Sequence, residues 1–173
     1  PALRAPILAI YHFAREADDI ADEGDAPAAQ RLQDLGRYRA ALERAVRGDA
    51  AVDSDWPQVF GPLASALRSH ALPPPLLHDL LSAFEQDVRY TDEGRRYVSH
   101  EALLDYCRLS ANPVGRLLLH LYGVTDARSL QQSDQICSAL QLINFWQDLS
   151  VDLPRRRHYL PRDVMAQHGV TDA

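Results

Sequence analysis

Two groups of acidic residues stand far apart in the chain, and each group has the spacing of one helix face. The first consists of Asp18, Asp19 and Asp22, and the second of Asp148 and Asp152, preceded by Asn144. Residues four apart on a helix lie one above the other. Oxygen ligands held together in this way suit a hard cation such as Mg²⁺, which also keeps several water molecules. We therefore expect two sets of Mg²⁺ ligands.

Both groups lie where a helix is expected to end. Gly24 follows the first group, and Pro154 follows the second. Either residue is typical of a helix C-terminus, where the helix dipole disfavours negative charge. Either group taken alone also fits an ordinary solvated helix end. If the two helices face each other, however, they form an acidic rim at which Mg²⁺ could hold a diphosphate leaving group. Arg15 and Arg157 are placed to contact its phosphates.

The helix that carries the second group is expected to be buried on nearly all sides. Apolar residues fill most of its circumference, namely Leu142, Ile143, Phe145, Leu149 and Val151. Buried carboxylates without partners are costly, so their presence on such a helix indicates cations or a wet cavity beside it.

Composition and spacing favour an all-α protein. The 173 residues are 46% hydrophobic and rich in Ala, Leu and Arg, which suits one helical domain over residues 1–173. The expected helices cover residues 7–23, 27–48, 56–70, 75–92, 99–123 and 129–152, and no strand pattern appears. The arginines of the second helix, such as Arg31, are interpreted as a solvated face. Residues 48–55 are expected to form a linker.

Local signals indicate where these helices start and bend. Asp55 and Ser99 are expected to cap the helices that follow them. Pro113, within residues 110–115, predicts a kink in the fifth helix. This kink either widens a cavity, with Gly115 allowing a close approach, or serves packing alone.

Several classes of function are disfavoured. The net charge of −6 argues against general nucleic-acid binding. No HExxH, glycine-rich phosphate loop or GxSxG motif occurs, and the seven histidines are not clustered. Cys107 and Cys137 form no metal or disulfide pattern, so we expect a reducing, cytoplasmic location. No apolar run is long enough to span a bilayer. The basic run 155–157 allows a peripheral membrane contact, although it also fits a solvated loop.

The motifs themselves resemble those of a known family. Residues 15–22 (READDIAD) and 144–152 (NFWQDLSVD) resemble the first and second aspartate-rich motifs of the squalene/phytoene synthase family. Residues 159–161 (YLP) stand where that family carries a matching segment. Residues 106–115 (YCRLSANPVG) look like the hopanoid-associated bacterial branch, whereas phytoene and dehydrosqualene synthases tend to carry an Ala-Gly-Thr-type segment there.

The resemblance implies an isoprenoid synthase-type helical bundle around a central apolar cavity, with Mg²⁺ as cofactor. It implies a prenyl diphosphate substrate: two farnesyl diphosphates couple to presqualene diphosphate, which ionises to give hydroxysqualene or squalene. The implied Mg²⁺ ligands are Asp18, Asp22, Asp148 and Asp152, supported by Asp19 and Asn144. Arg15 and Arg157 would contact phosphate. Tyr106 would line the cavity as a further catalytic residue, and the implied substrate-binding residues there are Asn112, Gly115 and Tyr159.

The sequence also departs from the family pattern. Gln147 stands where some relatives have an arginine, and roughly the last hundred residues expected of the family are missing, so we expect an incomplete domain. A phytoene or dehydrosqualene synthase is the alternative enzyme. A non-catalytic helical fragment or assembly subunit is the alternative of another class.

Overall fold

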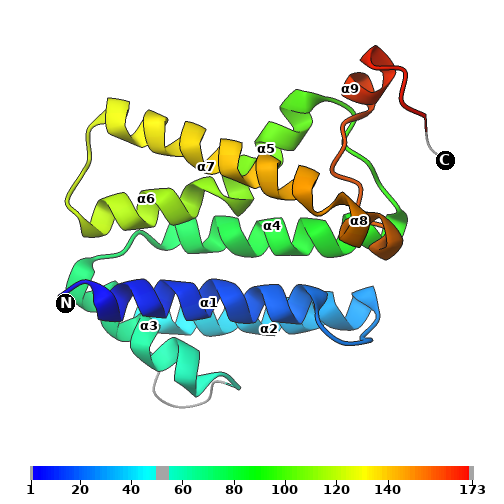
Figure 1. Cartoon of the computed structure of the whole chain (residues 1–173). Helices are drawn as coiled ribbons and strands as arrows, with labels where there is room; N and C mark the ends of the chain where they lie inside the picture. The colour runs from blue at the N-terminus through cyan, green and yellow to red at the C-terminus, as the bar shows by residue number, and fades with distance from the viewer. Residues whose placement is uncertain (1, 50–54, 172–173) are drawn as a thin grey trace.

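The computed structural model describes residues 2–49 and 55–171, and in these ranges it contains helices and no strands (Figure 1). The predicted all-α fold class is thereby confirmed. Residues 50–54 of the expected linker lie outside the described part. The helices are α1 (Arg4–Asp22), α2 (Ala28–Arg47), α3 (Pro57–His70), α4 (Pro74–Glu93), α5 (His100–Ser110), α6 (Asn112–Leu121), α7 (Ala127–Gln147), α8 (Leu149–Asp152), the 3₁₀ turn η1 (Leu153–Arg155) and α9 (Arg162–Gln167).

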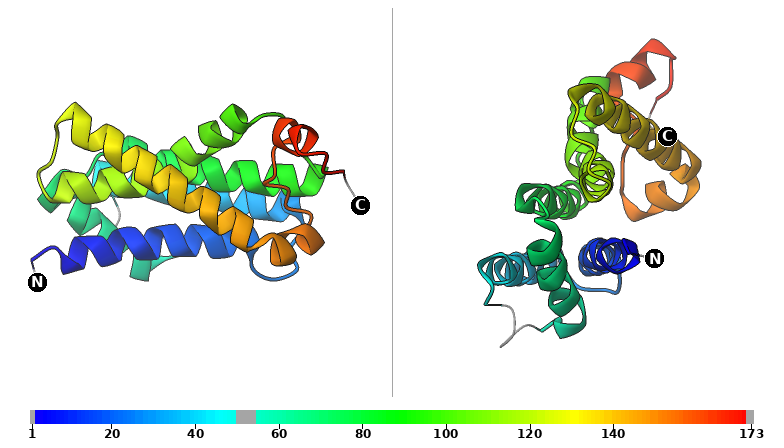
Figure 2. Two further views of the ribbon diagram at one scale, coloured as in Figure 1. Left: turned by 45° about the horizontal axis from the view of Figure 1, so that its top comes forward. Right: turned by 90° about the vertical axis from the view of Figure 1, so that its left-hand side faces the viewer.

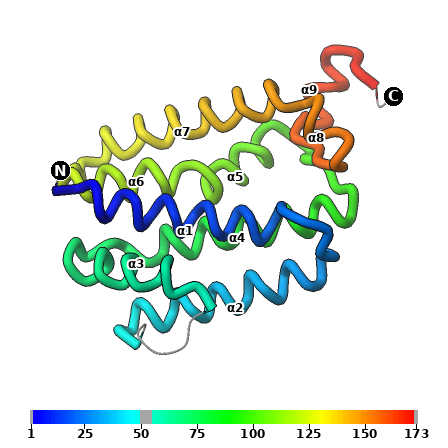
Figure 3. Tube along the Cα trace, turned by 60° about the horizontal axis from the view of Figure 1, so that its bottom comes forward, coloured from blue at the N-terminus to red at the C-terminus, as the bar shows by residue number. Residues whose placement is uncertain are grey.

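Helix α4 lies at the centre of the bundle. It packs against α1 and α2 on one side and against α5 and α6 on the other, while α7 packs on α6. Seen down the bundle, α1 and α7 lie toward the same side of α4 and α6 (Figure 2). Helices α1, α4 and α7 run in the same direction, so their C-terminal ends gather at one end of the bundle, beside α8 (Figures 1 and 3). This arrangement brings the two acidic groups to the same end.

Two clusters of buried side chains hold the bundle together. The larger one lies mainly between α1, α2, α3 and α4. At its centre the Tyr38 hydroxyl donates a hydrogen bond to the Phe13 carbonyl over 3.0 Å, and the two rings stack. The smaller cluster is aromatic and joins α4 and α5 to α7 and the segment after η1; its members include Tyr97, Tyr106, Phe145 and Tyr159. This second cluster forms one wall of the candidate site.

The local signals are partly confirmed. Ser99 caps α5, because its side chain accepts a hydrogen bond from the Ala102 amide over 3.2 Å. The predicted kink is a complete break at Ala111, which separates α5 from α6. The predicted cap at Asp55 is wrong: Trp56 takes the N-cap position, and the Asp55 carboxylate instead pairs with Arg37 of α2. The nearby guanidinium attracts this carboxylate away from the helix end.

The sequence predicted that helix α7 is buried on nearly all sides, and this prediction is wrong. Leu142 and Phe145 are buried, but Ile143 and Trp146 are 44% and 49% exposed. The apolar side chains of Ile136 and Leu140 are also exposed. The described helices cover only one face of α7, because α6 and α5 both pack on that side.

Gly115 allows the close approach of α6 to α7 rather than shaping a cavity. A Cβ atom at this position would lie 2.5 Å from Ser133 Oγ and 2.6 Å from Cys137 Sγ, both on α7. Gly115 therefore serves the packing of α6 on α7, the second of the two roles predicted for the kink.

We predict that Gly115→Ala destabilises the fold by about 1–3 kcal/mol, because the added methyl group overpacks this contact. Urea unfolding would measure the change. Gly36→Ala is the matched control, since Gly36 lies inside α2 with open space around its Cα. It should raise stability by roughly 0.5–1 kcal/mol through helix propensity. Equal effects of the two substitutions would contradict the packing role of Gly115.

Candidate active site

A cavity of about 940 Å³ opens where the C-terminal ends of α1, α4 and α7 gather. Charged side chains dominate its lining. The carboxylates are Asp18, Asp22, Glu23, Asp25, Asp87, Asp92, Asp148 and Asp152, and the cations are Arg31, Arg155, Arg156 and Arg157. Twice as many acidic as basic groups therefore surround the cavity, at the negative ends of three helices. Such a place favours added positive charge.

Arg157 connects the two acidic groups. Its guanidinium pairs with Asp22 of α1 and lies 3.9 Å from Asp152 of α8, measured from Nη1 to Oδ1. Arg155 also reaches Asp22, at 3.4 Å. The structure therefore brings one carboxylate of each acidic group to the same cation, although 130 positions of sequence separate Asp22 from Asp152.

The second group keeps its helical spacing through the junction of α7 and α8. The Asp148 amide donates to the Asn144 carbonyl over 3.0 Å, and the Asp152 amide donates to the Asp148 carbonyl over 2.9 Å. All three side chains line the same cavity. The junction thus preserves the i, i+4, i+8 face that the sequence predicted.

The electrostatics of the rim also favour a cation. Burial raises the pKa of Asp18; the Arg15 charge opposes this rise, and the Asp19 charge adds to it. Burial likewise raises the pKa of Asp152, and the neighbouring Asp148 charge adds to that rise. A bound cation would relieve both effects by stabilising the charged carboxylates.

The donor set fits Mg²⁺ if water and phosphate supply the other ligands. Among residues 2–49 and 55–171, no group of three or more His, Cys, Asp or Glu side chains gathers into a metal site by itself. Mg²⁺ commonly takes only one or two carboxylates together with water and substrate phosphates. The Nε–H of Arg157 is buried without a hydrogen-bond partner in the structure, so it can donate to an anion in the cavity.

Arg15 turns toward its own helix. It forms ion pairs with Asp18 at 3.0 Å and with Asp19 at 2.7 Å, and half of its side chain is exposed. Arg15 therefore neutralises part of the first acidic group, and Asp19 supports the rim through Arg15.

Asn112 and Gly115 lie apart from the acidic cavity. Asn112 is buried at the start of α6, where its Oδ1 accepts a hydrogen bond from Ser138 Oγ over 2.9 Å. Its side chain borders a second cavity of about 530 Å³, which also touches Tyr106. Tyr106 and Tyr159 both line the acidic cavity itself.

Arg31 holds the end of α1 and is not part of a solvated face. Its guanidinium donates to the carbonyls of Ile20, Glu23 and Gly24 over 2.7–3.1 Å, and to Ala26 over 2.9 Å. Helix C-termini leave such carbonyls without partners. Arg31 therefore fixes the chain just beyond Asp22 and places a positive charge at that pole of the helix.

We predict that Arg31→Lys destabilises the fold by about 1–3 kcal/mol, because one ammonium group cannot serve four carbonyls arranged around a planar fork. Urea unfolding would measure the loss. Arg37→Lys, on the same helix, is the control and should change stability little, since Arg37 makes exposed ion pairs. A loss no larger than that of the control would refute the capping role of Arg31.

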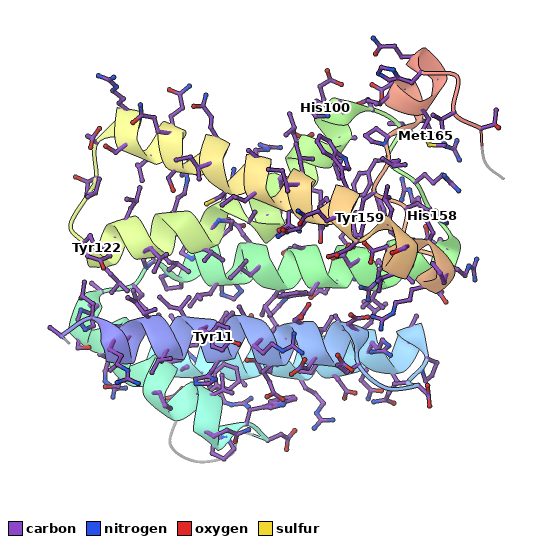
Figure 4. All side chains as sticks on the ribbon, in the orientation of Figure 1. Tyr11, His100, Tyr122, His158, Tyr159 and Met165 are labelled. Carbon is purple, nitrogen blue, oxygen red and sulfur yellow. The ribbon has the colours of Figure 1, made fainter. Side chains whose placement is uncertain are left out.

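Asp87 is a site residue that the sequence analysis missed. It lies on α4, and each of its oxygens accepts a hydrogen bond from a tyrosine: Tyr159 donates to Oδ1 over 3.2 Å, and Tyr106 donates to Oδ2. The Phe145 and Tyr159 rings stack with centroids 3.9 Å apart. Figure 4 shows Tyr159 between α7 and α4, next to α8. The sequence does carry one signal, since Asp87 is the lone carboxylate on the face of α4 that includes Leu80, Phe84 and Val88.

Burial raises the pKa of Asp87 from its ordinary value of 3.8 to about 7. The hydrogen bonds from Tyr106 and Tyr159 oppose this rise, whereas the charges of Asp18 and Asp152 add to it. Burial also raises the pKa of both tyrosine hydroxyls, and the Asp87 charge adds to each rise. The tyrosines therefore stay protonated as donors at neutral pH.

We predict a pH-dependent stability effect of Asp87. Because its pKa is higher in the folded protein, its ionisation lowers the free energy of unfolding as the pH rises from about 4 to about 7, and not beyond. Asp87→Asn should remove this slope. Above pH 7 the free energy of unfolding of Asp87→Asn should exceed that of wild type by a few kcal/mol at most, since each unit of pKa shift corresponds to about 1.4 kcal/mol. Urea unfolding of both proteins at pH 5 and pH 8 measures this difference in stability. The same difference between variant and wild type at both pH values would contradict the raised pKa.

Comparison with known proteins places this chain in a family. The family model for squalene/phytoene synthase matches residues 1–173. A hydroxysqualene synthase from Zymomonas mobilis is 38% identical over 99% of the chain and 54% of its own length. A presqualene diphosphate synthase from Rhodopseudomonas palustris is 31% identical over 97% of the chain and 57% of its own length. The chain belongs to the squalene/phytoene synthase family.

A solved structure agrees with this assignment. The crystal structure of squalene synthase HpnC from Alicyclobacillus acidocaldarius superposes with a TM-score of 0.85 and 36% identity, over 98% of this chain and 60% of that one. The isoprenoid synthase-type fold is therefore confirmed. The chain spans little more than half the length of these relatives. Within the described ranges, none of the helices has the length and apolar character that crossing a membrane requires.

Proposed function

We propose that the full-length protein is a Mg²⁺-dependent enzyme that ionises presqualene diphosphate and releases hydroxysqualene. One observation carries this proposal: Asp22 and Asp152, from the two acidic groups, meet at Arg157 on the rim of a cavity with excess negative charge. The hydroxysqualene synthase among the relatives supports the choice of product.

The rim residues would bind and orient the diphosphate. The Arg157 Nε–H is buried and has no partner in the structure, so it can donate to a phosphate oxygen. Asp18 and Asp22 on one wall, and Asp148 and Asp152 on the other, would hold Mg²⁺. When bound, Mg²⁺ would offset the negative charge that develops on the leaving diphosphate.

The aromatic wall below the rim would face the hydrocarbon part of the substrate. Phe145 and Tyr159 stack there, and Tyr106 stacks on Tyr159 with ring centroids 6.2 Å apart. Aromatic faces attract cations, so this wall suits the carbocation that remains after the diphosphate departs. Buried Tyr106 and Phe145 also limit access of bulk water.

The alternatives differ in product or in class. Direct formation of squalene, or condensation of two farnesyl diphosphates, would use the same rim. A phytoene or dehydrosqualene synthase is disfavoured by the residues 110–115 segment. A non-catalytic helical fragment or assembly subunit would not need the paired acidic groups. The proposed location is cytoplasmic. Arg155 and Arg157 pair with Asp22, so a membrane contact through the basic run would have to rely mainly on Arg156.

We predict that Asp148→Asn lowers the turnover of presqualene diphosphate by roughly 100-fold or more without unfolding the bundle. Mg²⁺ supplies several kcal/mol of charge stabilisation, and each 1.4 kcal/mol is about tenfold in rate. Diphosphate release with Mg²⁺ measures turnover, and circular dichroism measures helix content. The control is Asp105→Asn, since Asp105 is an exposed residue of α5 paired with Arg108.

The substrate and product are tested on the wild-type protein. Presqualene diphosphate and farnesyl diphosphate are supplied separately with Mg²⁺, and the products are identified by mass spectrometry. Hydroxysqualene from presqualene diphosphate supports the proposal. Squalene, dehydrosqualene or phytoene would transfer the assignment to one of the alternative enzymes, and no turnover of either substrate would favour the non-catalytic alternative.

A further inference from the structure

We propose that Asp87 is a positioning residue that orients the Tyr106 and Tyr159 hydroxyls and, through Tyr106, takes up the proton lost when water captures the substrate cation. This inference rests on the proposed function and deepens it. It concerns the step after the diphosphate has left, whereas the aspartates of the rim act on the leaving group.

The geometry fixes the direction of two hydroxyl hydrogens. The Tyr159 hydroxyl donates to Asp87 Oδ1 over 3.2 Å, and the Tyr106 hydroxyl donates to Oδ2. A phenol has one hydrogen to donate. With both hydrogens committed to Asp87, the tyrosine oxygens can act only as acceptors toward the cavity, which both residues line.

An acceptor-only surface orients water for attack. A water molecule beside Tyr106 must donate a hydrogen to the phenol oxygen, which leaves the water lone pairs free to face the cation. Tyr106 and Tyr159 are only 4% and 8% exposed, so such a water would be held away from bulk solvent. A tyrosine without its Asp87 partner could instead donate its own hydrogen to the water and occupy the attacking lone pair.

The proton balance of the step involves three groups. A lone pair of the water oxygen forms the new C–O bond to the cationic carbon. One water proton moves to the Tyr106 oxygen while the Tyr106 hydrogen moves to Asp87 Oδ2. The products are a neutral alcohol, an intact Tyr106 and a protonated Asp87, which later returns the proton to solvent. No oxidant or reductant is required.

Asp87 suits this task better than the aspartates of the rim. Asp22 and Asp152 face the Arg157 guanidinium at the rim, where the diphosphate would bind. Asp87 instead has two phenols as hydrogen-bond partners, and its pKa of about 7 allows it to accept a proton and release it again near neutral pH. An asparagine there offers one acceptor oxygen in place of two, so one of the tyrosines would lose its partner.

The test measures diphosphate release and alcohol formation separately, in the full-length protein with Mg²⁺ and presqualene diphosphate. We expect Asp87→Asn to release diphosphate within about threefold of wild type. The alcohol fraction of the products should fall about tenfold or more, since positioned proton transfer commonly contributes at least that much. Hydrocarbons formed by proton loss would replace the alcohol. An unchanged alcohol fraction, or loss of diphosphate release in a folded variant, would overturn the proposal.

A double-mutant cycle tests whether Asp87 acts through Tyr106. Tyr106→Phe should change the product ratio as Asp87→Asn does, and combining the two should add less than about twofold, because both remove the same relay. If the effects of the two substitutions on the alcohol fraction multiply in the double variant, the proposed relay is wrong. If Asp87→Asn does not fold, Tyr106→Phe serves as the test, since it removes only the hydroxyl group of the relay. A wild-type alcohol fraction in that variant would refute the inference.

Two further variants distinguish a failure of this inference from a failure of the proposed function. Asp148→Asn should lower diphosphate release without changing the alcohol fraction, and Asp105→Asn should change neither. If the wild-type protein releases no diphosphate, the proposed function itself fails. If wild type forms the alcohol and Asp87→Asn forms it in the same proportion, only the inference about Asp87 fails.

Discussion

The convergence of three helix C-termini is the constraint on which the site depends. Helices α1, α4 and α7 end on the same side of the bundle, where their dipoles already place negative charge. Carboxylates at these ends raise the electrostatic cost further, and four arginines offset only part of it. Arg31 satisfies the carbonyls at the end of α1, and Arg157 lies between Asp22 and Asp152. The bundle thereby remains folded with a concentration of negative charge at its rim, and the rim can still bind a further cation.

Below the rim the same bundle creates a different environment. The side chains of the aromatic cluster are buried, and Asp87 can be tolerated there because two tyrosine hydroxyls satisfy its oxygens. The charges of Asp18 and Asp152 act on Asp87 through the cavity and favour its protonated form. Carboxylates of the same chemical type thus have different partners: Asp22 and Asp152 face arginines, whereas Asp87 has two phenols, and burial raises its pKa to about 7.

The sequence predicted what depends on local spacing. The helices and both acidic groups follow from periodicity, and the Ser99 cap and the break near Pro113 follow from residue type. Asp87 could not be assigned in the same way, because its partners lie 19 and 72 positions away. Arg31 was missed for a similar reason: a helical arginine usually extends into solvent, and only the folded turn after α1 brings the carbonyls within its reach. Tertiary proximity decides such roles.

The exposed face of α7 shows why apolar periodicity does not establish burial. Ile136, Leu140 and Ile143 recur at helical spacing and are 61%, 56% and 44% exposed. An apolar side chain is buried only where another element covers it. On α7 this cover comes from α6 through Gly115, whose missing side chain lets Ser133 and Cys137 approach closely. The same helix α7 carries Asn144 in its last turn, and Asn144 lines the cavity, so the contact that seats α7 on α6 belongs to the framework of the site.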